Sequence, residues 1–275
     1  MLKVVAHAGL MASTVAPARR PSDRLGALGT WRAAWTWRHS VFAATVIVYL
    51  ALVVMVIVGS PLDNLDQQIA ALDLRGRWPG WHRFVLDYVM FGQRGPSTLA
   101  ALPLIVWIAR RRRSFAPFVT IGTALVLLNL SVGVIKVATG RYGPLVTAHA
   151  HEVLAGGNIF PSGHTANAVV LYGVLAMMAT RHRRAMTVFA VWISFTVGLS
   201  TLYLDTHWLT DVVGGWLAGA IVLMMLPRCL PVAERVIGAG VEWLRRLNEP
   251  QRRYRPAHWR ASDDPSARQV LRTLP

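Results

Sequence analysis

The chain has 275 residues, 54% of them apolar and 15% charged, and it carries 29 lysines and arginines against 13 acidic residues. Long apolar stretches make it one polytopic membrane domain and exclude a soluble protein. The net charge of +16 raises the question of nucleic acid. No basic-aromatic binding motif accompanies that charge, so we do not expect nucleic acid as a partner.

Six apolar segments follow one another along the chain. The first, residues 41–59, is nineteen residues without a charge, enough to cross a hydrocarbon core of ~30 Å as a helix. The following five segments are 96–109, 115–137, 164–179, 185–203 and 208–226. The second of the six, 96–109, is short and is expected to extend back toward Tyr88. This pattern predicts an all-α fold, a bundle of six transmembrane helices.

Between the first two segments, residues 62–94 alternate charged and bulky side chains, among them Trp78, Trp81 and Phe84. Such alternation favours short amphipathic helices that lie along the membrane surface. We therefore expect an interfacial helical region directly after the first span.

Basic residues gather on one side of the predicted topology. Residues 1–40 carry six of them, four consecutive arginines occupy 110–113, three more lie between 181 and 184, and ten arginines follow Leu226. The positive-inside rule then places both termini in the cytoplasm. We expect a basic cytoplasmic segment over 1–40, a membrane domain over 41–230, and a basic, partly disordered cytoplasmic tail over 231–275. Cys229 is the only cysteine, which excludes an intrachain disulfide.

The fourth segment begins with Pro161, Ser162, Gly163 and His164. Proline and serine suit a helix start, and the free N–H groups and partial positive charge of such a start bind anions. Ser162 can add its hydroxyl, and His164 stands just inside the helix, within reach of a leaving-group oxygen. This start is a candidate phosphate site.

Lys136 is the only lysine in the membrane part of the chain, and Arg141 follows it five residues later. Lys136 is a candidate phosphate ligand. The alternative is an anchor whose ammonium reaches the interface.

His207 and Asp211 precede and open the sixth segment at i, i+4 spacing, which puts them on one face of a helix. Asp211 can accept the Nδ1 proton and leave Nε2 of His207 free as a nucleophile. The alternative is a capping pair at the interface, with Trp208 in the aromatic belt.

These three blocks resemble the signature of the type 2 phosphatidic acid phosphatase superfamily, whose soluble relatives include vanadium haloperoxidases. The matching blocks span Lys136 to Pro144, Pro161 to His164, and Ser200 to Asp211, and the resemblance covers about residues 41–226. It implies a six-helix membrane fold and hydrolysis of phosphate esters or anhydrides without a metal or other cofactor.

The resemblance also implies a role for each matching residue. His207 would form a phosphohistidine, Asp211 would orient it, and His164 would protonate the leaving group. The phosphate oxygens would be held by Lys136, by Ser162 and by the backbone of Gly163.

Two positions depart from the family pattern, because Gly143 and Thr201 stand where the family has arginines. A hydrogen bond to a charged group contributes about 1.5–3 kcal/mol, so both losses together would cost roughly 3–6 kcal/mol. We expect Arg141 to substitute, with His149 and His151 as weaker candidates. Those two histidines and Glu152 also hint at a metal site, which we do not expect in a loop of this kind.

The sequence thus predicts hydrolysis of a lipid phosphate or diphosphate at the outer face of a bacterial inner membrane. Polyprenyl and glycerolipid substrates both stay open. So do a phosphotransferase that uses the same residues and a catalytically weak relative that binds lipid headgroups. The chain is expected to be a monomer or a homodimer, since the small-residue pair Gly215 and Gly219 suits packing either within the bundle or between copies.

Overall fold

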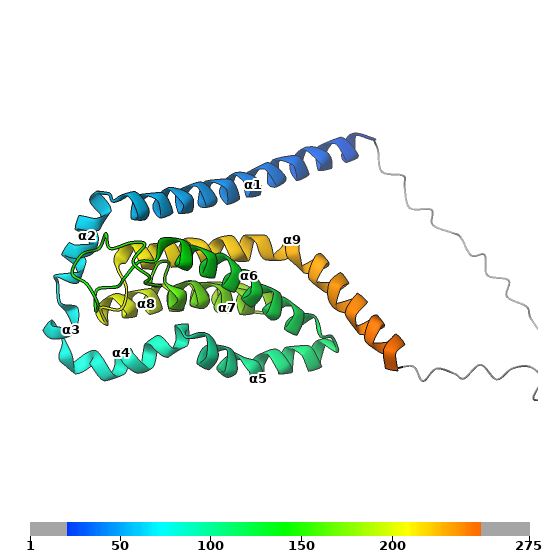
Figure 1. Ribbon diagram of the computed structural model, residues 1–275. Coiled ribbons are helices and arrows are strands. Elements are labelled where there is room, and N and C mark those ends of the chain that lie inside the picture. The colour runs from blue at the N-terminus through cyan, green and yellow to red at the C-terminus, as the bar shows by residue number, and fades with distance from the viewer. Residues whose placement is uncertain (1–20, 249–275) are drawn as a thin grey trace, which may run out of the picture.

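The computed structural model describes residues 21–248, with side chains over 37–245, and every regular element in that range is a helix (Figure 1). Residues 1–20 of the predicted basic segment and 249–275 of the predicted tail lie outside the described residues, so the predicted disorder of the tail stays a prediction. The elements are α1 (Pro21–Val58), α2 (Pro61–Ala70), α3 (Leu74–Arg77), η1 (Pro79–Trp81), α4 (His82–Val89), η2 (Met90–Gly92), α5 (Arg94–Arg112), α6 (Ala116–Thr139), α7 (Gly163–Met178), α8 (Arg183–Tyr203) and α9 (Leu209–Asn248).

Helix α7 is the centre of the bundle, and α6, α8 and α9 pack around it (Figure 1). Its residues Val170, Leu171 and Val174 are fully buried, and they join a core that includes Leu128 of α6 and Leu226 of α9. Helix α1 lies outermost, against α9. A helix surrounded in this way carries apolar side chains on all sides, which is why α7 shows no hydrophobic periodicity.

Each of the six predicted segments contains a helix. Four helical stretches are long and apolar enough to cross a membrane, Trp37–Val58, Ala116–Thr139, Arg183–Tyr203 and Leu209–Arg245. The chain is therefore a multi-pass membrane protein. Helix α7 is apolar but has only 16 residues, about 24 Å in length, and an extended residue, Gln93, separates α5 from the helical turn before it. The count of six crossings stays a prediction.

The second segment does not continue as one helix back to Tyr88, as the sequence suggested. A 3₁₀ turn, η2, separates α4 from α5, and the chain becomes extended at Gln93, where ψ is 129°. Gly92 is needed at this break, because a Cβ there would lie 2.5 Å from the Val197 side chain and 2.9 Å from the His164 carbonyl oxygen. Side chains of α7 satisfy the carbonyls that the break frees. Asn167 donates to the Gly92 oxygen at 3.0 Å, and Tyr172 donates to Phe91 at 3.2 Å.

Residues 62–94 form short helices, as predicted, and α4 packs against α8. The Tyr203 hydroxyl donates to the Trp78 carbonyl just before α4, and the Tyr88 hydroxyl lies 2.6 Å from that of Thr196 near the end of α4. Between these two contacts α4 runs alongside the C-terminal half of α8, and Trp78, Trp81 and Phe84 stay exposed. The position of this region at the membrane surface stays a prediction.

The last helix, α9, continues to Asn248 through Pro227 and Pro231. Part of the predicted tail, from residue 231, is thus helical. Figure 1 shows the start of α1, the end of α9 and the α5–α6 connection at one end of the molecule, and α2, α3 and the loop 140–162 at the other. This arrangement places residues 110–113 and the described parts of the two terminal segments at the same end.

Gly215 and Gly219 of α9 serve packing within the bundle. A Cβ on Gly215 would lie 2.7 Å from the Ser162 carbonyl oxygen, and one on Gly219 would lie 2.6 Å from Cβ of Val169. The absence of side chains at these positions lets α9 approach α7 closely, as small residues do in membrane bundles.

We predict that Gly219→Ala lowers the thermal unfolding midpoint in detergent, because the added methyl group overpacks the α7–α9 contact by about 1–3 kcal/mol. The matched control is Gly238→Ala on the same helix, where a Cβ meets nothing within 4 Å. That change should leave the midpoint equal or raise it, since alanine is the better helix former. Equal behaviour of the two variants would contradict the close approach described here.

Candidate active site

A cavity of about 570 Å³ opens among four parts of the chain that are distant in sequence. The break before α5 contributes Arg94, α6 contributes Lys136, the start of α7 contributes His164, and the turn before α9 contributes His207. The predicted histidines therefore converge on one space, and their ring centroids are 6.3 Å apart. Gly163 also lines this cavity, so the first turn of α7 faces it.

Asp211 lies beside His207 as the i, i+4 spacing predicts, with its Oδ2 3.4 Å from Nδ1 of the imidazole. Nδ1 is buried and has no hydrogen-bond partner within residues 37–245, so the contact is an approach rather than a formed bond. The same Oδ2 accepts the backbone N–H of Trp208 at 2.8 Å. Asp211 thus also caps α9, as the alternative interpretation held. Trp208 itself is buried and donates to the Tyr142 carbonyl, so it is no part of an aromatic belt.

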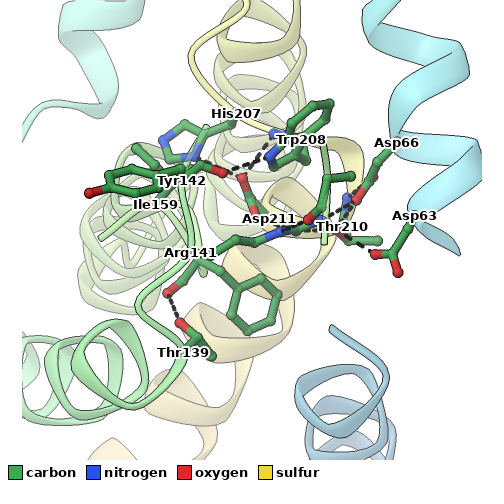
Figure 2. Close-up of polar contacts among 12 residues, drawn as sticks. Asp63, Asp66, Thr139, Arg141, Tyr142, Ile159, His207, Trp208, Thr210 and Asp211 are labelled. Carbon is green, nitrogen blue, oxygen red and sulfur yellow. Dashed lines mark hydrogen bonds and ion pairs between the residues drawn. The ribbon is translucent and has the colours of Figure 1, made fainter. Parts of the chain in front are cut away.

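Arg141 does not reach the cavity, and the prediction that it substitutes as a phosphate ligand is wrong. Its side chain is fully buried, and its guanidinium is surrounded by protein acceptors (Figure 2). It donates to Asp211 Oδ1 at 2.8 Å, to Asp66 Oδ2 at 2.7 Å, to Thr210 and to the Ala150 carbonyl. A guanidinium occupied in this way holds Asp211 in place behind His207.

Asp66 is a member of this network that the sequence did not reveal as such. From α2 it accepts the Thr210 N–H at 2.9 Å and the Thr210 hydroxyl at 2.5 Å, besides its bond with Arg141 (Figure 2). Burial raises the pKa of Asp66, and the bonds from Thr210 and the charge of Arg141 act in the opposite direction. The only sequence feature that could have indicated this role is the pair of acids Asp63 and Asp66, three residues apart. Acidic residues are equally expected in a loop on the predicted outer side.

Lys136 and the start of α7 agree with the prediction to different degrees. The Lys136 ammonium donates to the carbonyls of Asn158 and Ile159 and lines the cavity, so it does not act as an anchor toward the interface. Ser162 is fully buried, does not line the cavity, and caps α7 by accepting from the N–H of Thr165. Its hydroxyl therefore faces the helix, while Gly163 presents backbone to the cavity.

Arg94 is the cavity residue that sequence reasoning missed. It opens α5 directly after the break, lines the same space as Lys136 and His164, and donates to Asn129 Oδ1 on α6. A single arginine before an apolar segment resembles an ordinary flanking charge, and only the break in the helix brings it inside.

No group of three or more His, Cys, Asp or Glu side chains within residues 37–245 is placed to hold a metal ion. His151 approaches Asp63 at 3.8 Å, and neither it nor His149 lines the cavity.

Comparison with known proteins gives a family match for part of the chain. Residues 117–235 match the family described as the PAP2 superfamily. This part of the chain, 119 of 275 residues, is similar to that superfamily.

Among curated PAP2-related proteins, phosphatidylglycerophosphatase B of Bacillus subtilis (strain 168) is 34% identical over 74 residues, which cover 24% of this chain and 36% of that protein. This chain thus aligns with about a third of its relative's length. A crystal structure of a transmembrane PAP2 type phosphatidylglycerolphosphate phosphatase from Bacillus subtilis superposes with a TM-score of 0.52 and 24% identity over 68% of this chain and 94% of that one. The structure of Aquifex aeolicus LpxE gives a TM-score of 0.42 and 21% identity over 58% and 93%. The first superposition supports the shared fold.

The two departures from the PAP2 pattern lie together next to His207. A Cβ on Gly143 would lie 3.0 Å from the Thr206 carbonyl oxygen, and the Thr201 carbonyl accepts from both the N–H and the hydroxyl of Thr206. Both positions therefore shape the turn that presents His207. Neither supplies a cation to the cavity.

We predict that Asp66→Ala destabilises the protein by about 3–5 kcal/mol, because it leaves Arg141 buried without one of its charged partners. The matched control is Asp87→Ala, which removes an exposed ion pair with Arg83 and should cost less than about 1 kcal/mol. Denaturant unfolding in micelles measures both variants. Equal midpoints would show that the Arg141 network carries no stability.

Proposed function

We propose that this protein hydrolyses a lipid phosphate or diphosphate through a phosphohistidine intermediate on His207. The observation that carries the proposal is the shared cavity, in which two imidazoles 6.3 Å apart meet two cationic side chains and the first turn of a helix. A phosphoryl group needs this set of partners, namely a nucleophile, an acid, and donors for its charged oxygens.

In the first step, neutral His207 attacks phosphorus through Nε2, and a P–N bond forms as the P–O bond to the lipid breaks. Protonated His164 gives its proton to the departing oxygen. Asp211, held by Arg141 and by the Trp208 N–H, keeps the imidazole oriented and stabilises its positive charge. Lys136 and the N–H groups at the start of α7 hold the oxygens on which negative charge develops.

In the second step, His164 has become neutral and takes a proton from a water molecule. The water oxygen attacks phosphorus, the P–N bond breaks, and inorganic phosphate leaves with His207 restored. An acceptor alcohol in place of water would give transfer instead of hydrolysis. Phosphate release by the purified protein distinguishes the two outcomes.

The substrate chemistry follows from where the cavity lies. Gly95 and Gly133 line it, and a Cβ on either would meet nothing within 4 Å, so the wall there leaves room for a lipid chain. Lys136 lies in the last turn of α6, toward the end of the bundle opposite the arginine-rich connections. We therefore infer that the site opens to the outer face of a bacterial inner membrane. Because a relative is named a phosphatidylglycerophosphatase, phosphatidylglycerol phosphate is the first substrate to test, followed by phosphatidic acid and polyprenyl diphosphates.

We predict that His207→Ala and His164→Ala each lower phosphate release from these lipids by at least about 10³-fold, because one removes the nucleophile and the other the acid. The matched control is His182→Ala in the exposed α7–α8 connection, which should act like the parent. A chelator should leave the parent rate unchanged. Release by His207→Ala at the parent rate would remove the proposed mechanism, and loss of activity with chelator would remove its metal independence.

We predict the orientation from labelling of single cysteines in a Cys229→Ser background. Val146→Cys, in the exposed loop beside the cavity, should react with a membrane-impermeant maleimide on intact spheroplasts. Ser114→Cys, in the α5–α6 connection, should react only after lysis. The reverse pattern would put the site on the cytoplasmic face.

A further inference from the structure

Two cations face the cavity without an acidic partner. Neither Arg94 nor Lys136 has a carboxylate within 4 Å among residues 37–245. Within that part of the chain Lys136 donates to backbone carbonyls alone, and Arg94 donates to the neutral amide of Asn129 alone. Cations within a membrane domain are expensive unless they pair or face water, so such residues mark sites for ions or substrates. Arg94 and Lys136 together therefore indicate a binding site for an anion.

Arg141 gives the contrast within the same chain. Its guanidinium has three carboxylates within 4 Å, those of Asp63, Asp66 and Asp211. Its charge is thus neutralised by protein, and a phosphate would gain little from it. Arg94 keeps its charge available for a ligand.

The break between α4 and α5 aims Arg94 at the start of α7. A Cβ built on Gly163 would lie 3.9 Å from Nη2 of Arg94 and 3.8 Å from Cε of Lys136, so the two cations flank one point at the helix start. Non-helical backbone at this depth is tolerated where it lines a cavity and its polar groups find partners. Here Asn167 of α7 donates to both the Gly92 carbonyl and the Ser97 hydroxyl, each at 3.0 Å. The break is therefore a built feature that fixes the position of Arg94.

We propose that Arg94 binds the phosphoryl group of the substrate, with Asn129 as the positioning residue that orients its guanidinium. This inference rests on the proposed function. A planar guanidinium suits phosphate better than an ammonium, because it offers two parallel donors. Arg94 thereby supplies, from a different helix, the cation that Gly143 and Thr201 do not provide.

Inhibition by inorganic phosphate and the kinetics on phosphatidylglycerol phosphate test the assignment. Arg94→Gln should weaken phosphate inhibition about 10- to 100-fold and lower kcat/KM by a similar factor, as the loss of a charged donor predicts. Arg94→Lys should fall between Arg94→Gln and the parent. The control is Arg110→Gln at the far end of the same helix, where the side chain is exposed. It should match the parent.

A second variant tests the charge while keeping the arginine. Asn129→Asp gives Arg94 a carboxylate partner, so phosphate inhibition should weaken as it does in Arg94→Gln. This result separates ligand binding from a structural role, since the new ion pair keeps the α5–α6 contact. Thermal unfolding without phosphate checks that both variants are folded.

The outcomes distinguish the two proposals. A parent protein whose melting temperature rises with inorganic phosphate, but which releases no phosphate from any lipid, would overturn the proposed function. The role of Arg94 would still be tested by comparing this rise in melting temperature between the parent and Arg94→Gln. A parent protein that hydrolyses lipid phosphate, with Arg94→Gln and Asn129→Asp inhibited as strongly as the parent, would keep the function and overturn the role of Arg94. A parent protein that neither binds nor is inhibited by phosphate would overturn the assignment of Arg94 as well.

Discussion

The buried guanidinium of Arg141 joins the parts of the molecule that build the site. It lies in the loop after α6 and reaches Asp66 on α2 and Asp211 on α9, while its Nε–H bonds the Ala150 carbonyl. An unpaired charge at this position would be costly, so each of these partners must be in place when the protein folds. The result is that an outer helix, a loop and the helix behind His207 adopt one arrangement relative to each other.

Arginine has two opposite uses in this chain, and the difference lies in the acids nearby. Three carboxylates surround Arg141 and neutralise its charge, so that this arginine connects the elements from which they come. Around Arg94, a neutral amide fixes the direction of the side chain and leaves the charge in place. In an environment of low dielectric constant, a charge that the protein has left uncompensated interacts strongly with a ligand of opposite sign. The neighbouring side chains therefore separate a structural arginine from a binding one.

Much of the fold could be predicted from the sequence, because long apolar segments separated by arginine-rich connections leave few alternatives in a membrane. His164, His207 and Lys136 could also be assigned to one site, since each stands at the end of an apolar segment on the same predicted side. The break at Gly92 could not be predicted. It depends on hydrogen bonds that Asn167 and Tyr172 of α7 donate to the carbonyls of Gly92 and Phe91, and no local sequence pattern indicates these bonds. The misassignment of Arg141 has a similar cause. Its position next to the motif favoured a ligand, and only the tertiary contact with Asp66 shows that its donors are already in use.

Helix α7 has a mechanical consequence beyond its place in the core. Its first residues carry His164 and the amides that face the cavity. One turn further, Asn167 donates hydrogen bonds to the Gly92 carbonyl and the Ser97 hydroxyl, on either side of Arg94. Helix α7 therefore holds both His164 and the backbone that precedes Arg94, although the two side chains come from separate helices. The N–H of Ser162, at the same helix start, also donates to the Asp211 carbonyl at 2.8 Å, so the turn that carries His207 is tied to α7 as well. A displacement of α7 would therefore carry His164, Arg94 and the His207 turn with it, and the cavity between them would keep its shape.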